Sequence, residues 1–306
     1  MEQRAIIGCI LLLFGASIGV EAQTDYQREQ QTWRHDREEK LKAADGWLTV
    51  AGLFWLREGT NDFGNGPTND IVLPSTQAAD RIGTIDLAGE QIWLRVANGV
   101  RVTIDGKPVQ ETAIELKANS SRPIVHGDLT FIILRRGDKY GLRFKDQNSA
   151  ARRHFSGLRW YPVKEDYRVT ASFTPYERPR EVPIINLLGD IEKYRSPGLL
   201  RFKLEGKEYT LEPVEVGDQR FFIIFRDLTS NRTTYGAARF LYTSLPVDGK
   251  VTIDFNQAIN PPCAFTIFAT CPLPPRQNRL NVAIEAGEQL YPGVISDHAI
   301  NKYQDN

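Results

Sequence analysis

Short segments in which hydrophobic and polar residues alternate recur along most of the chain between residues 47 and 254. Val, Ile, Thr, Tyr, Phe and Trp are frequent in these segments, and Gly, Pro, Asn and Asp separate them. A period of two places successive side chains on opposite faces of a strand, and these residue types favour strands. The pattern therefore predicts an all-β protein.

The first series of segments predicts an antiparallel β-sandwich over residues 46–148. Asn65-Gly66 and Asp105-Gly106 are among the turn pairs that separate its strands. Asn-Gly and Asp-Gly accept the positive φ that tight hairpins require.

The second series predicts a second antiparallel sandwich or small barrel over residues 164–290, ending in a Pro-rich loop. The junction between the domains, residues 149–163, is both basic and aromatic. Its Trp160 is interpreted as a wedge between the domains, and an anionic ligand facing its arginines is the alternative. Residues 291–306 form a polar tail.

The N-terminus has the features of a secretory signal peptide over residues 1–22. Arg4 precedes an apolar run, residues 5–20, and Val20-Glu21-Ala22 supplies small residues for cleavage. We expect a secreted or periplasmic protein with no transmembrane segment after signal removal; an uncleaved anchor is the alternative.

Residues 23–45 change to helical spacing, with Trp33, Arg37 and Leu41 on one face of a predicted amphipathic helix. We expect this face to dock onto the body of the protein.

Charge and cysteine content narrow the possible partners. Lys plus Arg and Asp plus Glu both number 38, so the net charge does not favour nucleic acid as a partner.

Removal of the signal peptide also removes Cys9 and leaves Cys263 and Cys271, which predict a disulfide in an exported chain, with free thiols as the alternative. No cofactor motif is present, and no metal site is expected because the four His residues lie far apart in the sequence.

Charged and amide side chains are concentrated in the C-terminal domain. Arg239 lies in an apolar segment, and Asp254 precedes Asn256 by two residues, so we expect a paired polar cluster. The functional interpretation is a pocket for a small polar or acidic ligand; an internal salt-bridge network is the alternative. The predicted ligand-binding residues are Arg226, Tyr235, Arg239, Asp254, Asn256, Asn260 and Arg279.

Common enzyme motifs such as Gly-x-Ser-x-Gly and His-Glu-x-x-His are absent from the sequence. A hydrolase with acid and base groups among Asp227, Asp254 and Tyr235 stays open as a second hypothesis, because two carboxyl groups suffice for glycoside hydrolysis. A structural or interaction module without a pocket is the third.

The N-terminal half resembles a forkhead-associated (FHA) sandwich in residues 63–73, 97–109 and 126–131. The resemblance implies that fold and, in the family, phosphothreonine binding. Asn65 stands at the position of the family's phosphate-binding Arg, and no Ser that convincingly matches the family's phosphate-binding Ser follows it. We therefore do not expect phosphopeptide binding.

The mature chain also resembles bacterial proteins grouped as domain of unknown function 1684. The motifs that carry this resemblance include residues 47–56 and 225–230, Tyr235-Gly-Ala-Ala-Arg-Phe-Leu, and residues 254–265 and 271–280. The resemblance implies no agreed activity. It does imply that one site, structural or functional, contains Arg226, Asp227, Tyr235, Arg239, Asp254, Asn256, Asn260, Cys263 and Cys271.

Overall fold

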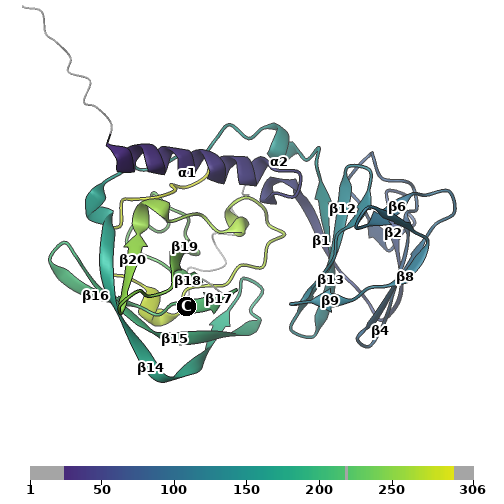
Figure 1. Cartoon of the computed structure of the whole chain (residues 1–306). Coiled ribbons are helices and arrows are strands. Elements are labelled where there is room, and N and C mark those ends of the chain that lie inside the picture. The colour runs from purple at the N-terminus through teal and green to yellow at the C-terminus, as the bar shows by residue number, and fades with distance from the viewer. Residues whose placement is uncertain (1–23, 218–219, 293–306) are drawn as a thin grey trace, which may run out of the picture.

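The computed structural model describes residues 24–217 and 220–292, which form two β domains and one long helix (Figure 1). The predicted signal peptide, Cys9 and the chain beyond residue 292 lie outside the described residues. Strands dominate both domains, which confirms the all-β class. None of the helices in the described part of the chain combines the length and hydropathy of a membrane span.

Helix α1 (Asp25–Lys42) begins with a capping box, in which Thr24 and Gln27 exchange hydrogen bonds of 3.2 and 3.0 Å. The box satisfies two backbone N–H groups of the first helical turn. Figure 1 shows the helix lying across the second domain, and Gln30 and Leu41 are its buried residues. The predicted N-terminal helix is therefore confirmed.

The first domain is a sandwich of two sheets. One sheet contains β1 (Val50–Trp55), β13 (Lys139–Asp146), β12 (Leu129–Arg136), β11 (Ile124–His126), β6 (Val102–Ile104) and β7 (Lys107–Val109), with β9 (Leu116–Lys117) and β10 (Ser120–Ser121) attached. The other contains β3 (Ile71–Val72), β2 (Gly59–Gly64), β4 (Gly83–Ala88), β5 (Gln91–Val96) and β8 (Glu111–Ala113). Phe131 packs against Phe63 from the opposite sheet at 5.3 Å between ring centroids, so the core lies between the sheets.

Local sequence accounts for the hairpin between β6 and β7, whereas the predicted hairpin turn at Asn65-Gly66 is wrong, because neither residue has a positive φ and the flanking strands β2 and β3 pair parallel. Asp105 and Gly106 connect β6 to β7 with φ values of 51° and 74°. Two successive positive φ values are typical of a tight hairpin turn, and Gly and Asp adopt them at little cost. The predicted Asp-Gly turn is confirmed here.

The sandwich begins and ends on neighbouring strands. β1 and β13 pair antiparallel, and Val50 lies opposite Lys145. The chain that enters at β1 therefore leaves beside it, and the hydroxyl of Ser149 donates to the Leu48 carbonyl at 2.6 Å where the two connections meet. As a result, α1 and residues 150–292 together form the second domain, and the sandwich is inserted between them.

The second domain also contains two antiparallel sheets. The four-stranded sheet has the order β16 (Lys207–Leu211), β15 (Ile191–Leu204), β14 (Arg168–Ile185) and β20 (Lys250–Asp254); the three-stranded sheet has the order β17 (Val214–Val216), β18 (Arg220–Phe225) and β19 (Arg239–Ser244). Phe255 lies 5.6 Å from Phe202 of one sheet and 5.6 Å from Phe225 of the other, measured between ring centroids. The apolar core therefore joins the two sheets.

Strand β14 is longer than its sequence pattern suggests. The pattern contains two separate strand segments, 167–173 and 182–188, but one strand of 18 residues runs from Arg168 to Ile185. Its pairing with β15 is irregular between Pro175 and Arg180. The prolines interrupt the alternation and the ladder without ending the strand, because an irregular register tolerates the missing N–H groups.

After β20 the chain has no named strand among the described residues and forms short 3₁₀ turns, η3 (Phe255–Gln257), η4 (Pro262–Ala264) and η5 (Arg276–Asn278). The Pro-rich segment, residues 260–275, contacts the sandwich: Thr266 Oγ1 donates to the Val50 carbonyl at 3.2 Å, and Arg136 Nε donates to Thr270 Oγ1 at 2.9 Å. This segment therefore joins the two domains.

The predicted wedge residue occupies a different place. Trp160 lies 5.7 Å from Trp33 of α1, between ring centroids, and its Nε1 donates to Glu38 at 3.1 Å. The prediction that it separates the two β domains is therefore wrong, since it supports the helix.

Candidate functional site

The polar residues predicted as one site lie in several separate clusters. Among the described residues, no hydrogen bond or ion pair joins Arg239 to Asp254, the pair on which the predicted cluster was centred. Each of these side chains has other partners. The single-cluster prediction is therefore wrong, and each cluster is described in turn.

Arg239 pairs with Asp227 instead. Arg239, on β19, is 1% exposed, and its Nη1 donates to Asp227 Oδ2 at 2.6 Å and to the Ile284 carbonyl at 2.9 Å. Its Nη2 donates to the Ala286 carbonyl. The other Asp227 oxygen accepts from the Thr229 N–H at 2.6 Å. This is the structural network foreseen as the alternative, and it fastens the last segment of the domain to the three-stranded sheet.

Asp254 and Asn256 lie beneath α1. The Tyr26 hydroxyl lies 2.9 and 2.8 Å from the two Asp254 oxygens, and Gln30 Nε2 donates to Oδ2 at 3.2 Å. Asn256 Nδ2 donates to the Tyr26 hydroxyl at 3.0 Å. Burial and then the hydrogen bond to Asp254 raise the pKa of Tyr26 above its usual value. Side chains of the helix thus occupy the polar groups that were expected to orient a ligand.

Asn260 belongs to a second buried cluster under the same helix. Its backbone N–H donates to Glu288 Oε2 at 2.8 Å, and Arg37 Nε donates to Glu288 Oε1 at 2.7 Å. Burial raises the pKa of Glu288, and the charge of Arg37 opposes this effect. Glu288 was not predicted, because nothing near it in the sequence indicates that Arg37 lies beside it.

Tyr235 is buried, and its hydroxyl donates to the Cys263 carbonyl at 3.2 Å. Cys263 and Cys271 are both buried free thiols, so the structure does not contain the predicted disulfide. They are neighbours: the Cys263 N–H donates to Cys271 Sγ at 3.2 Å. Burial, followed by the hydrogen bond to Cys271, raises the pKa of the Cys263 thiol. The spacing of the cysteines therefore predicted their proximity but not their redox state here.

The three hydrolase candidates have separate hydrogen-bond partners. Asp227 contacts Arg239, Asp254 contacts Tyr26, and Tyr235 contacts a backbone carbonyl. No hydrogen bond among the three candidates is found in the described part of the chain.

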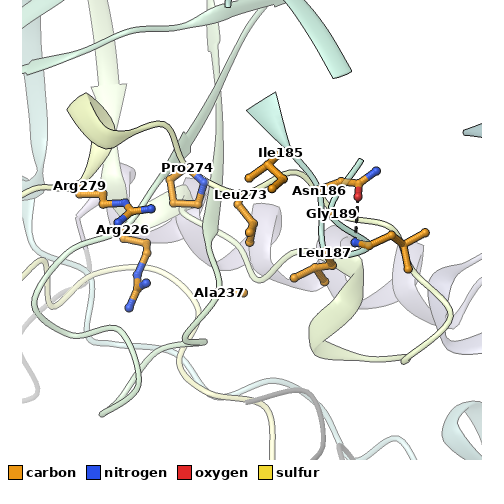
Figure 2. A pocket seen from close by; sticks show the side chains of 10 residues that line it. Ile185, Asn186, Leu187, Gly189, Arg226, Ala237, Leu273, Pro274 and Arg279 are labelled. Carbon is orange, nitrogen blue, oxygen red and sulfur yellow. Dashed lines mark hydrogen bonds between the residues drawn. The ribbon is translucent and has the colours of Figure 1, made fainter. Parts of the chain in front are cut away.

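Arg226 and Arg279 are the predicted residues that line a cavity. Residue 226 follows β18 and residue 279 follows η5, and their backbones form a parallel bridge: the Arg226 N–H donates to the Asn278 carbonyl at 3.0 Å, and the Leu280 N–H donates to the Arg226 carbonyl at 2.8 Å. This bridge places the two arginines side by side at one end of a cavity of about 320 Å³ (Figure 2).

Neither guanidinium has a hydrogen-bond or ion-pair partner within residues 24–217 and 220–292. Burial, followed by the charge of Arg279, lowers the pKa of Arg226. Asp227, the neighbouring carboxylate, is already paired with Arg239. Arg226 and Arg279 also line a more open hollow on the side of Asp227 and Leu228. The pair therefore presents two guanidinium groups without an ion-pair partner among the described residues, although the charge of Asp227 still acts on Arg226.

The rest of the cavity is largely apolar. It is lined by the end of β14 and the turn that follows it, by the residue two before β19, and by the Pro-rich segment: Ile185, Asn186, Leu187, Leu188, Gly189, Ala237, Leu273 and Pro274. Sequence reasoning missed these residues. The only indication was the segment 184–188, in which four apolar residues flank Asn186 and continue past the end of the strand at Ile185.

No group of three or more His, Cys, Asp or Glu side chains that could hold a metal ion occurs in the described ranges. In the sandwich, Asn65 stands at the position of the FHA family's phosphate-binding Arg, and its side-chain amide donates a hydrogen bond to the Ser75 carbonyl.

The residues that line this cavity lie within the part of the chain that matches a family model. Residues 153–289, which include every cavity-lining residue, match the model of a family described as "Protein of unknown function (DUF1684)". An uncharacterised protein from Haloarcula marismortui, solved in solution, is similar at 32% identity, over 45% of this chain and 78% of that one, with a TM-score of 0.38. No curated protein matches significantly.

FHA domains are also among the similar structures. The FhaA FHA domain, solved in complex with the intracellular domain of another protein, shares 23% identity over 30% of this chain and 97% of its own, with a TM-score of 0.22. An FHA domain from work on phosphothreonine-dependent interactions shares 23% identity over 30% of this chain and 92% of its own, with a TM-score of 0.22. Scores this low carry no argument about function.

Proposed function

The chain belongs to the DUF1684 family, and we propose that its C-terminal domain binds a small molecule with an acidic group in the cavity beside Arg226 and Arg279. The observation that carries the proposal is a pair of arginines with bridged backbones, which line one cavity and have no side-chain partner among the described residues. Two like charges held side by side repel each other, and an anion between them removes that repulsion. Guanidinium groups also match carboxylate and phosphate oxygens in geometry.

The cavity has properties of a ligand site. Its volume, about 320 Å³, falls within the usual range for small-molecule sites, which are mostly apolar with a few polar groups that fix the ligand's orientation. The predicted residues Arg239, Asp254, Asn256, Asn260 and Tyr235 serve instead to hold the domain together. Ligand binding in this proposal therefore depends on Arg226 and Arg279 alone among the predicted set.

The test is isothermal titration calorimetry with butanoate, succinate and inorganic phosphate, and with butanamide as the uncharged control. We expect at least one anion to bind and the amide not to bind. The double variant Arg226→Gln/Arg279→Gln should weaken anion binding by at least about tenfold, because each charged hydrogen bond contributes about 1.5–3 kcal/mol. Arg276→Gln is the matched control, since Arg276 is an exposed arginine of the same segment that does not line the cavity.

Two results would overturn the proposal. One is that no anion in the panel binds to the wild-type protein. The other is that the double variant binds the anion as well as the wild-type protein and the Arg276→Gln control do.

We further propose that the protein is exported after cleavage behind Ala22. Such a cleavage leaves Gln23 and Thr24 ahead of α1, so the capping box at Thr24 is retained. Edman sequencing of the protein recovered outside the cytoplasm should begin at Gln23. A start at Met1 contradicts this proposal.

Export would expose Cys263 and Cys271 to oxidising conditions, and their proximity supports formation of a disulfide. A small organic disulfide, acting as oxidant, takes up two electrons and two protons from the two thiols and is reduced to two thiols itself. Alkylation of the unfolded exported protein without reductant should then label neither cysteine. Two alkyl groups per chain would contradict this proposal.

A further inference from the structure

We infer that the ligand is a single-chain anionic amphiphile, an acid whose unbranched apolar chain extends away from the two arginines. This inference rests on the proposed function and specifies the class of molecule that binds there. Figure 2 shows the basis: Arg226 and Arg279 lie at one side of the cavity and Leu187 at the other, with Leu273 between them. Charge and apolar surface are therefore separated along the cavity.

The apolar end would gain from a hydrophobic occupant. Ile185 and Leu188, at the end of β14 and in the turn after it, are each 47% exposed, and both line the cavity. Burial of such surface against an alkyl chain is favourable in proportion to the area removed from water. A compact hydrophilic anion would leave these two side chains exposed.

The cavity offers little to a ligand rich in hydroxyl groups. Apart from the two arginines, Asn186 is the cavity-lining residue with a polar side chain, and it is 1% exposed. Its Oδ1 accepts from the Leu188 N–H at 2.8 Å and from the Asp190 N–H at 3.1 Å, and its Nδ2 donates to Glu192 at 3.3 Å. A sugar acid would lose hydrogen bonds to water without replacing them, which is costly. An alkyl chain has no such requirement.

The size of the cavity sets a limit on the chain. About 320 Å³ lies near the lower end of the range for small-molecule sites, so it suits one chain of medium length and not a two-chain lipid. The head group can be a carboxylate or a phosphate monoester, since guanidinium groups bind both.

The test is a chain-length series of butanoate, hexanoate, octanoate and decanoate, titrated calorimetrically into the full mature chain. Each added methylene should tighten binding by about fourfold until the chain fills the cavity, after which the affinity should level off. Octyl phosphate against octanoate identifies the preferred head group, and octanamide tests the need for charge.

Leu188→Asn is the variant that tests the apolar end. Leu188 is half exposed, so the substitution leaves the core unchanged, and we expect roughly fivefold weaker binding of octanoate with butanoate unaffected. Leu245→Asn, at an exposed leucine that does not line the cavity, is the matched control.

The outcomes separate this inference from the proposed function. Binding that depends on Arg226 and Arg279 but not on chain length overturns the amphiphile and leaves the acid site intact. Failure of every acid to bind overturns both. Chain-length dependence that Leu188→Asn does not reduce would place the chain elsewhere and also contradict the inference.

Discussion

Replacement of Arg239 by Met tests whether the buried pair with Asp227 stabilises the second domain. The side chains of Arg239 and Asp227 are 1% and 0% exposed, and the guanidinium also donates to the carbonyls of Ile284 and Ala286. The substitution leaves a buried carboxylate without its counter-charge and two carbonyls without a donor. Removal of one partner from a buried pair costs about 3–5 kcal/mol.

This cost should be visible in thermal unfolding followed by circular dichroism. At about 2–4 °C per kcal/mol for a domain of this size, Arg239→Met should lower the melting temperature by roughly 10 °C. Arg226→Met is the matched control: Arg226 lies beside Asp227 in sequence but has no side-chain partner among the described residues, so its free energy of unfolding should change by no more than about 0.5 kcal/mol. Equal melting temperatures for Arg239→Met and the control would refute the reasoning.

Further predictions concern the helix and its buried partners. Tyr26→Phe should weaken the docking of α1 by about 1–3 kcal/mol, because both oxygens of Asp254 lose their hydroxyl donor; faster hydrogen exchange in residues 25–42 measures this, and unchanged exchange would contradict it. Burial raises the pKa of Glu288 above 4.5. The protonated carboxyl group therefore makes its full contribution to the free energy of unfolding below pH 4.5, and this contribution is lost as the pH rises through the raised pKa. Urea unfolding between pH 4 and 8 should show that Glu288→Gln removes this part of the pH dependence, whereas parallel curves for the two proteins would argue against the raised pKa.

Much of the fold could be predicted because its causes are local. Alternation of apolar and polar residues gave the strands, and the Asp105-Gly106 pair gave a hairpin with two positive φ values. Strand β14 was divided in the prediction because its prolines break the alternation, yet its partner β15 holds it together across an irregular register. This pairing involves a different segment of the chain, so the residues of β14 alone do not indicate that the strand is continuous.

The site was harder to predict because it depends on pairings between distant residues. Period two correctly identified Arg239 as a residue in need of a buried partner, but the loop after β18 supplies Asp227, and α1 supplies Tyr26 to Asp254. Arg226 and Arg279 were predicted, but the cavity beside them depends on Leu187 and Leu273, which are ordinary apolar residues in the sequence. Their position in space, and not their type, makes them part of a cavity.

The insertion of the sandwich between α1 and the rest of its domain has a consequence for synthesis on the ribosome. Tyr26 and Asp254 are 228 residues apart, and Arg37 and Glu288 are 251 apart, so the helix leaves the ribosome long before its partners are made. The first and last strands of the sandwich pair with each other, so the sandwich can fold as a unit before the partners of the helix are synthesised. Most of the helix surface is polar, so the undocked helix exposes little hydrophobic surface to chaperones or other nascent chains. Closure of the second domain must then be among the last events in the maturation of this protein, and among the slowest.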